Sequence, residues 1–189
     1  MKKPTGYDQA KAWTGEYEKL EAGGHICVIK QVKEETSKSG NQMLKIAFDI
    51  CEGEHAGYYQ RLFEKQVSEE EPKWRGVYYV VLTDDKNSTA RFKGFVTSIE
   101  ASNKGFAAFK GDELDLNAFK GKLFGGIFGK EQWEYNGKTG WTTKIFFLRS
   151  VEAIRNGVDI PEPRPLKNGY TAQENGSFEE IIADDDLPF

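Results

Sequence analysis

Apolar and polar residues alternate along two early segments of the chain with the two-residue period of a β-strand. Residues 25–34 are rich in β-branched side chains, and residues 42–52 alternate more regularly. One face of the second segment would carry Leu44, Ile46, Phe48 and Ile50. Because residues 36–41 have the composition of a turn, the two strands are predicted to form a hairpin. A symmetric turn would place Cys27 opposite Cys51, as two small side chains that stay reduced.

The pattern changes in the middle of the chain. Residues 58–66 and 77–83 are two further strand-like runs. After them the period lengthens to that of a helix, with Asn87 or Ser88 as the expected N-cap and Gly105 as the stop. The apolar positions of this helix are Phe92, Phe95, Val96 and Ile99.

Two more strands are predicted over residues 122–135 and 141–151. The dipeptide Asn136-Gly137 between them is the strongest short-range signal for a hairpin. The resulting order of strands, one helix and two final strands is that of an OB-fold. We therefore expect a mainly β protein, an OB-fold barrel of five or more strands with one helix between strands three and four. An open α+β sheet is the main alternative.

Charge divides the 189-residue chain near residue 155. Residues 156–189 contain eight acidic and two basic side chains, so their net charge is −6. The whole chain has a net charge of −4, and residues 1–155 therefore have a net charge of +2. Opposite signs suggest a nucleic-acid partner and a mobile tail. The second segment also holds four of the six prolines, and its composition is typical of disorder. We expect a nucleic-acid-binding domain over 1–155, and a disordered linker with an acidic interaction tip over 156–189.

Neither a membrane span nor secretion is expected. The chain has no run of about 18 uncharged apolar residues. The two lysines near its start are not followed by the apolar segment of a secretory signal. Two cysteines form neither a disulfide framework nor a CxxC pair. The expectation is a cytoplasmic protein.

The sequence does not favour catalytic chemistry. His25 and His55 are far apart in the chain and have no companion metal ligands nearby. The glycines Gly125, Gly126 and Gly129 lie within a predicted strand, where they suit the bending of a barrel better than a phosphate-binding loop. We therefore expect no enzyme activity, no cofactor and no metal.

Aromatic residues make up 13% of the chain, and several lie among basic residues. Stacking aromatics combined with Lys and Arg form binding surfaces for single-stranded nucleic acids. The candidates are Tyr58, Arg61, Lys65, Lys73, Trp74, Arg75, Lys130, Trp133, Tyr135, Lys138, Trp141 and Lys144. For each single aromatic residue, packing in the core or at a sheet edge is the competing role. Phe48, Phe92, Phe95, Phe124 and Phe128 lie in apolar periodic contexts and are expected in the core.

The predicted hairpin at Asn136-Gly137 also fixes the relation between two tryptophans. A two-residue turn pairs Trp133 with Gly140 and Trp141 with Gln132, so the two indoles lie on opposite faces. In an OB-fold this hairpin is one of the loops that bind oligonucleotides. Only one indole is therefore expected to face a bound strand.

The chain ends in Asp184-Asp185-Asp186-Leu187-Pro188-Phe189. This acidic tip resembles that of the single-stranded DNA-binding proteins of bacteria and their phages. The resemblance implies docking of the tip onto replication, recombination and repair proteins. An aromatic side chain beside a terminal carboxylate suits an apolar pocket with a basic rim, and the aspartates steer it there. The alternative is an acidic tail that only keeps the protein soluble.

The core is also similar to a phage-type group of small nucleic-acid-binding proteins, in short pieces over residues 17–24, 39–44 and 52–58. These pieces do not match the core motifs of the cellular protein, so a homo-oligomer stays open. Together the two resemblances imply a protein that coats and protects single-stranded DNA and recruits partners through its tip. The alternative is an adaptor that engages host repair proteins through the tip without binding DNA. DNA rather than RNA is implied by the tip alone.

Overall fold

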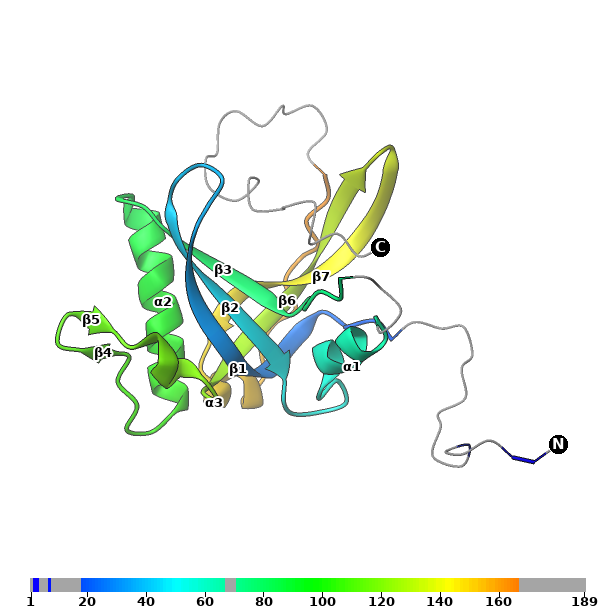
Figure 1. The fold of residues 1–189 in the computed structure, drawn as a ribbon, viewed down its shortest axis with the longest axis horizontal. Helices are drawn as coiled ribbons and strands as arrows, with labels where there is room; N and C mark the ends of the chain where they lie inside the picture. The colour runs from blue at the N-terminus through cyan, green and yellow to red at the C-terminus, as the bar shows by residue number, and fades with distance from the viewer. Residues whose placement is uncertain (1, 4–6, 8–17, 67–70, 167–189) are drawn as a thin grey trace.

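The computed structural model describes residues 2–3, 7, 18–66 and 71–166, and these form a mainly β fold (Figure 1). The long strands are β1 (Gly23–Thr36), β2 (Gln42–Ile50), β3 (Val77–Leu82), β6 (Leu123–Tyr135) and β7 (Lys138–Arg149). The helices are α1 (Tyr58–Glu64), α2 (Lys86–Ser102), the 3-10 helix η1 (Leu116–Phe119) and α3 (Val151–Arg155). Two short strands, β4 (Phe109–Lys110) and β5 (Glu113–Leu114), form a separate small hairpin.

The five long strands form one antiparallel sheet in the order β3-β2-β1-β6-β7. Helix α2 follows β3 in the chain and packs against β3, β6 and β7. Among the described residues, no strand pairing joins the two outer strands β3 and β7. None of the described helices is long and apolar enough to cross a membrane.

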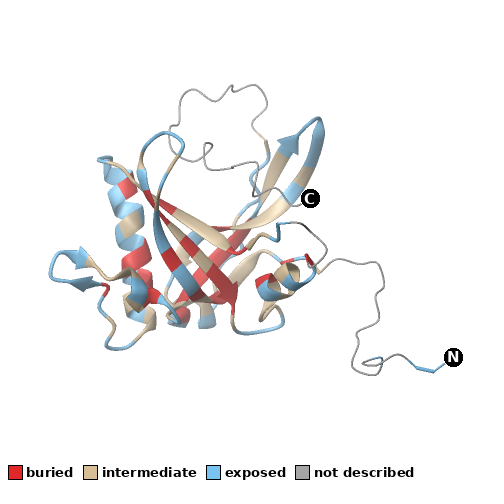
Figure 2. Ribbon diagram, in the orientation of Figure 1, coloured by how far each residue is buried: buried red, intermediate tan, exposed pale blue. Residues whose placement is uncertain are grey.

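The predicted apolar face of β2 is buried. Leu44, Ile46, Phe48 and Ile50 are each no more than 2% exposed. They pack with side chains from α2, η1 and β6 in one core, which Figure 2 shows as buried segments along the middle of the sheet and on α2. The core phenylalanines predicted from the sequence are confirmed as buried, except for Phe92, which is half-buried against the core.

The predicted pairing of the two cysteines is wrong by one residue. Near the turn, β1 and β2 pair symmetrically, with Thr36 opposite Gln42. An irregularity between Ile29 and Gln31 then adds one residue to β1, so that Cys27 lies opposite Ile50. Both cysteines are free thiols, and burial raises the pKa of each.

The segment after β2 was predicted as a strand over residues 58–66, and this prediction is wrong. The chain forms helix α1 there, preceded by Gly57 with a φ of 73°. The buried carboxylate of Asp49 accepts hydrogen bonds from the backbone N–H groups of Tyr59 and Gln60, at 2.9 and 3.3 Å. The helix therefore depends on a residue of β2, and the local pattern does not show this.

Helix α2 was predicted correctly, but its first residues were not. Its N-cap is Asp85, whose carboxylate accepts hydrogen bonds from the N–H groups of Asn87 and Ser88, rather than either of those residues. The Ser88 hydroxyl instead donates to the Val81 carbonyl at 2.6 Å, which ties the helix to β3. The helix ends at Ser102, three residues before Gly105.

The β6–β7 hairpin has the predicted register, with Trp133 opposite Gly140 and Gln132 opposite Trp141. The glycines of β6 give room to neighbouring side chains. A Cβ at Gly125 would lie 2.4 Å from Cγ1 of Ile154 in α3. A Cβ at Gly129 would lie 2.3 Å from the ring of Phe146.

The expected disorder of residues 156–189 is wrong for residues 156–166. This segment leaves α3 and lies against the sheet, where Val158 packs close to Gly24. Farther on, Arg164 forms a parallel bridge with Glu131 of β6. These contacts belong to partners distant in sequence, so composition did not reveal them. Residues 167–189, which include the acidic tip, lie outside the described residues.

Candidate nucleic-acid interface

The β6–β7 hairpin extends beyond the part of the sheet that contains β1. Figure 1 shows its turn and the β1–β2 turn projecting from the same end of the molecule. Strand β1 pairs with β6 only as far as Phe128, so the outer half of the hairpin stands apart from β1. This outer half carries six of the residues predicted to bind nucleic acid, which are Lys130, Trp133, Tyr135, Lys138, Trp141 and Lys144.

The register divides these six residues between two faces. Lys130 and Trp141 lie on the same face as the core residue Phe128, because side chains alternate along each strand. Trp133, Tyr135, Lys138 and Lys144 lie on the opposite face. The prediction that the two indoles face opposite sides is confirmed.

The two tryptophans also differ in their surroundings. Trp141 is 49% exposed. Trp133 is half-buried and covers its cross-strand neighbour, since a Cβ at Gly140 would lie 2.5 Å from Cζ2 of the indole. Trp141 is therefore the indole that is accessible to a ligand, and Trp133 packs on the hairpin.

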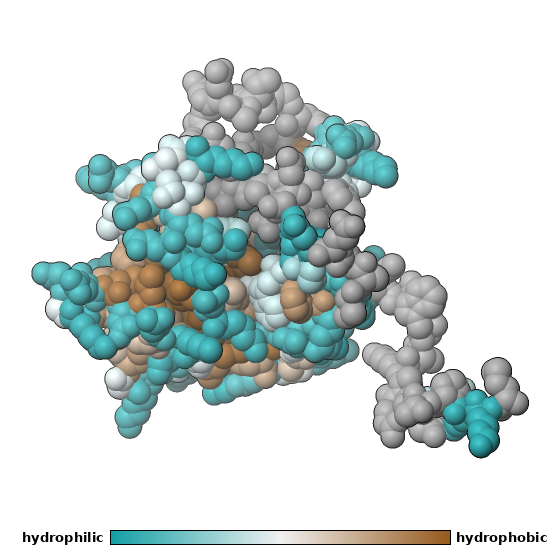
Figure 3. Space-filling view, viewed as in Figure 1, coloured by the Kyte–Doolittle hydropathy of each residue, from teal (hydrophilic) through white to brown (hydrophobic). Residues whose placement is uncertain are grey.

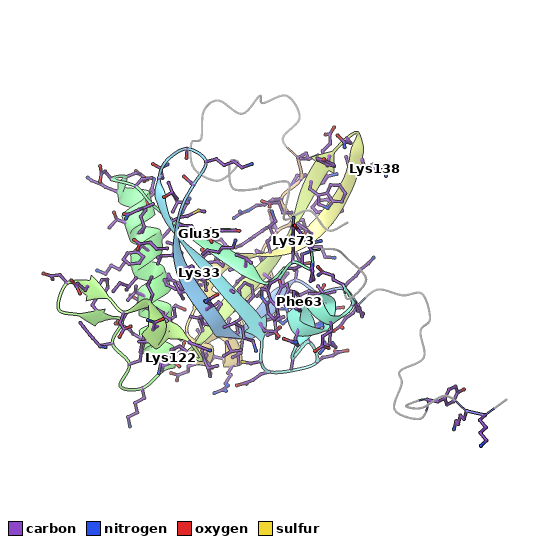
Figure 4. The ribbon with its side chains drawn as sticks, viewed as in Figure 1. Lys33, Glu35, Phe63, Lys73, Lys122 and Lys138 are labelled. Carbon is purple, nitrogen blue, oxygen red and sulfur yellow. The ribbon has the colours of Figure 1, made fainter. Side chains whose placement is uncertain are left out.

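The lysines of the hairpin are not equivalent. The Nζ of Lys144 lies 3.0 Å from a carboxylate oxygen of Glu131, so this charge is already paired. Lys130 and Lys138 are exposed and have no acidic partner among the described residues. Figure 4 shows Lys138 at the tip of the hairpin.

Three candidates lie in α1 or directly after it, and two of them contact Glu18, which precedes β1. Nε of Arg61 donates to a carboxylate oxygen of Glu18 at 3.0 Å, and a second guanidinium nitrogen lies 2.5 Å from the other oxygen. The hydrogen bond from Arg61 lowers the pKa of Glu18 below its usual value. The Tyr58 hydroxyl donates to the Glu18 carbonyl at 3.4 Å, and burial raises its pKa. Only Lys65 of this group is exposed.

The candidates before β3 are half-buried. The indole N–H of Trp74 donates to the carbonyls of Phe48 and Gly76, at 3.0 and 3.1 Å. Its ring lies 5.7 Å from that of Phe63, centroid to centroid. Trp74 therefore joins α1 to the sheet. Lys73 and Arg75 flank it in the chain.

The sequence reasoning missed a group on the outer face of β1, β2 and β3. Lys45 lies opposite Lys33 on one side and Tyr79 on the other. Its Nζ is 5.9 Å from the centre of the Tyr79 ring and 3.6 Å from a carboxylate oxygen of Glu35. Figure 4 shows Lys33 and Glu35 together on β1. The alternation of β2 already placed Lys45 on the outer face, but only the pairing of the strands brings Tyr79 beside it.

The two histidines, far apart in sequence, lie together in the fold. The ring centroids of His25 and His55 are 5.5 Å apart, in an edge-to-face arrangement. Burial lowers the pKa of His25, whose Nε2 lies 2.9 Å from the Glu21 carbonyl oxygen. No group of three or more metal-ligating residues is placed to hold a metal within the described part of the chain. The pair forms a ring contact between β1 and the loop before α1.

On the face of the molecule that Figure 3 shows, most side chains are hydrophilic. Figure 3 shows hydrophobic side chains gathered over α2 and the neighbouring part of the sheet. Phe92 of α2 makes an edge-to-face contact with Phe109 of β4, which is 39% exposed. None of the predicted nucleic-acid residues belongs to α2, β4 or β5.

The predicted partner-binding residues Asp184, Asp185, Asp186, Leu187, Pro188 and Phe189 lie outside the described residues. The chain matches no protein-family model. No curated protein sequence is similar to it either. The functional assignment therefore depends on the arrangement of the core and on the chemistry of the tip.

Proposed function

We propose that this chain is a single-stranded DNA-binding protein of the cytoplasm, with an OB-fold core and a C-terminal tip that recruits other proteins. The order of the strands supports the OB-fold. Strand β1 pairs with both β2 and β6, β2 pairs with β3, and β6 pairs with β7. Helix α2 lies between β3 and β6 in the chain. This order of strand pairing, with a helix between the third and fourth long strands, is the observation that supports an OB-fold.

The observation that carries the proposal is the exposed indole of Trp141 on the β6–β7 hairpin. In OB-folds the loop between the last two strands contacts oligonucleotides, together with the face of the second and third strands. Here that face presents Lys45 and Tyr79, and β1 adds Lys33. An indole and a phenol ring combined with lysines are the groups that bind single strands by stacking and by charge.

The proposed mechanism uses non-covalent binding and no reaction step. Bases stack on exposed aromatic rings, of which Trp141 is the first candidate, while lysines such as Lys130, on the same face of the hairpin as Trp141, meet the phosphates. Arg61 and Trp74 are left out of the proposed surface because their polar groups are bound within the fold. A strand held in this way has its bases occupied and stays unpaired.

The tip would serve partner recruitment. Three aspartates precede Leu187-Pro188-Phe189, which is the chemistry of a ligand for an apolar pocket with a basic rim. The second candidate function is an adaptor that uses this tip without binding DNA. The tip sequence favours both functions equally, so the core decides between them.

A fluorescence titration separates the two functions. The full chain is titrated with an oligo-dT strand and with a duplex of the same length, at two salt concentrations. Binding of the single strand should quench tryptophan fluorescence. Its affinity should fall with salt by about 0.7 log units per log unit for each phosphate contacted. Absence of quenching at low salt would contradict DNA binding and favour the adaptor.

A further inference from the structure

In the outer half of the β6–β7 hairpin, the edge of β6 that faces away from β7 does not pair with β1. Strand β1 ends its pairing with β6 at Phe128, whereas β7 continues along β6 to Tyr135. The segment Pro161–Leu166, here called the strap, lies along this edge. The N–H of Arg164 donates to the Lys130 carbonyl at 2.8 Å, and the N–H of Gln132 donates to the Arg164 carbonyl at 2.9 Å. The strap thus replaces β1 beside β6.

The side chain of Arg164 binds the other strand of the hairpin. Its guanidinium carbon lies 3.8 Å from the centre of the Phe146 ring, which is close for a cation–π contact. Phe146 is the extra residue where the β6–β7 register shifts, and its ring lies against Gly129. Arg164 therefore contacts β6 through its backbone and β7 through its guanidinium.

The strap is connected to the exposed indole through one residue. Gln132 is the cross-strand partner of Trp141. Its backbone N–H bonds to the strap, and its side-chain oxygen accepts a hydrogen bond from the N–H of Leu166 at 3.2 Å. The residue directly opposite Trp141 is therefore fixed at two points.

We infer that Arg164 is a positioning residue of the proposed nucleic-acid surface. The strap holds the outer half of the hairpin in one orientation and so presents Trp141 to the bound strand. This inference rests on the proposed function. The competing role for Arg164 is direct contact with a phosphate, because its side chain is exposed. The two roles predict a different dependence of the DNA affinity on salt. They also predict different effects when the planar guanidinium is replaced by the ammonium group of lysine.

The test compares full-length variants by oligo-dT titration over a series of salt concentrations. Arg164→Ala and Arg164→Lys should both lose at least about fivefold in affinity, because a lysine lacks the planar group that stacks on Phe146. The slope of log affinity against log salt should stay that of the parent. Phe146→Leu should give a similar loss, and the double variant with Arg164→Ala should lose no more than either single variant. Arg155→Ala, an exposed arginine on α3, is the matched control and should bind like the parent.

Hydrogen exchange gives a second measurement on the same proteins. The amide of Gln132 should exchange slowly in the parent and faster in Arg164→Ala. Normal affinity in Arg164→Lys, or a slope reduced by about 0.7, would assign Arg164 to a phosphate and overturn the inference. Faster exchange with unchanged affinity would also overturn it, because the strap would then serve the fold alone. A parent that does not bind oligo-dT at all would instead overturn the proposed function.

Discussion

The carboxylate of Asp49 accepts a hydrogen bond from the backbone N–H of Tyr59 at 2.9 Å, and this contact joins the end of β2 to the first turn of α1. A second bond comes from the N–H of Gln60 at 3.3 Å. Asp49 is only 2% exposed, so the bond from Tyr59 is shielded from water and the bond from Gln60 is partly shielded. The first turn of a helix has N–H groups without partners inside the helix, and Asp49 satisfies two of them.

Replacing Asp49 by Ala should lower the free energy of unfolding by about 1–3 kcal/mol, since the buried N–H of Tyr59 and the partly buried N–H of Gln60 lose their acceptor. Asp49→Asn keeps one acceptor oxygen and should lose less. Urea denaturation followed by circular dichroism measures both. The matched control is Asp112→Ala, on the exposed turn between β4 and β5. Equal stability of Asp49→Ala and Asp112→Ala would contradict the role of Asp49.

The ion pair of Glu18 with Arg61 should make stability depend on pH. The hydrogen bond from Arg61 lowers the pKa of Glu18 in the folded protein below its ordinary value of 4.5. The pair therefore stabilises the fold above that value, and its contribution is lost as the pH falls through the lowered pKa. Glu18→Gln should have a lower melting temperature than the parent at neutral pH, and the difference should shrink as the pH falls below 4.5 through the lowered pKa. Glu21→Gln, at an exposed position nearby, is the control. A difference that stays constant with pH would argue against the ion pair.

Trp141 and Trp133 should respond differently to replacement by Ala. Trp141→Ala should lose about 1–3 kcal/mol of oligo-dT binding, because its exposed indole is the proposed stacking platform. Trp133→Ala should mainly lower the melting temperature, because its indole packs on Gly140. Titration and thermal unfolding of both variants give the comparison. If both bind like the parent, the hairpin is not the platform and Tyr79 is the next candidate.

Deletion of residues 184–189 should leave DNA binding unchanged or slightly stronger. The segment from Asn156 onward carries −6, and its described part ends at Leu166, which is bonded to Gln132 on the hairpin. A polyanion tethered beside a nucleic-acid surface competes with DNA for the same lysines. The gain should be largest at low salt, where charges are least screened. Titration at two salt concentrations measures it, and weaker binding after the deletion would contradict the competition.

Removal of Phe189 alone should abolish most partner recruitment while all three aspartates remain. The aromatic side chain is then missing, and the terminal carboxylate moves to Pro188. Pull-down of purified replication and repair proteins by the parent, this deletion and a variant with Asn at 184–186 gives the comparison. A partner still held without Phe189, but lost with the three Asn residues, would show that the tip acts as a simple charge patch.

Several features followed from the sequence because they depend on neighbours in the chain. Asn136-Gly137 specifies a two-residue turn, and the turn alone sets the register that places Trp133 and Trp141 on opposite faces. The alternation of residues 42–52 identified the core face of β2, although Met43 and Asp49 on the other face are buried as well. The helix around Phe95 and Ile99 was evident from its period, although its N-cap was assigned two or three residues too late.

Tertiary structure decided the features whose partners are distant in sequence. The helix at Tyr58 depends on Asp49. The ordered conformation of residues 156–166 depends on the edge of β6 that does not pair with β1. The extra residue on β1 that moves Cys27 away from Cys51 has no local signature either. The same holds for the pairing of Lys45 with Tyr79, since the two strands are joined through α1 and a long connection. Backbone N–H and C=O groups bond to partners that are near in the folded structure. A pattern of residues along the sequence can indicate only those partners that are also near in the sequence.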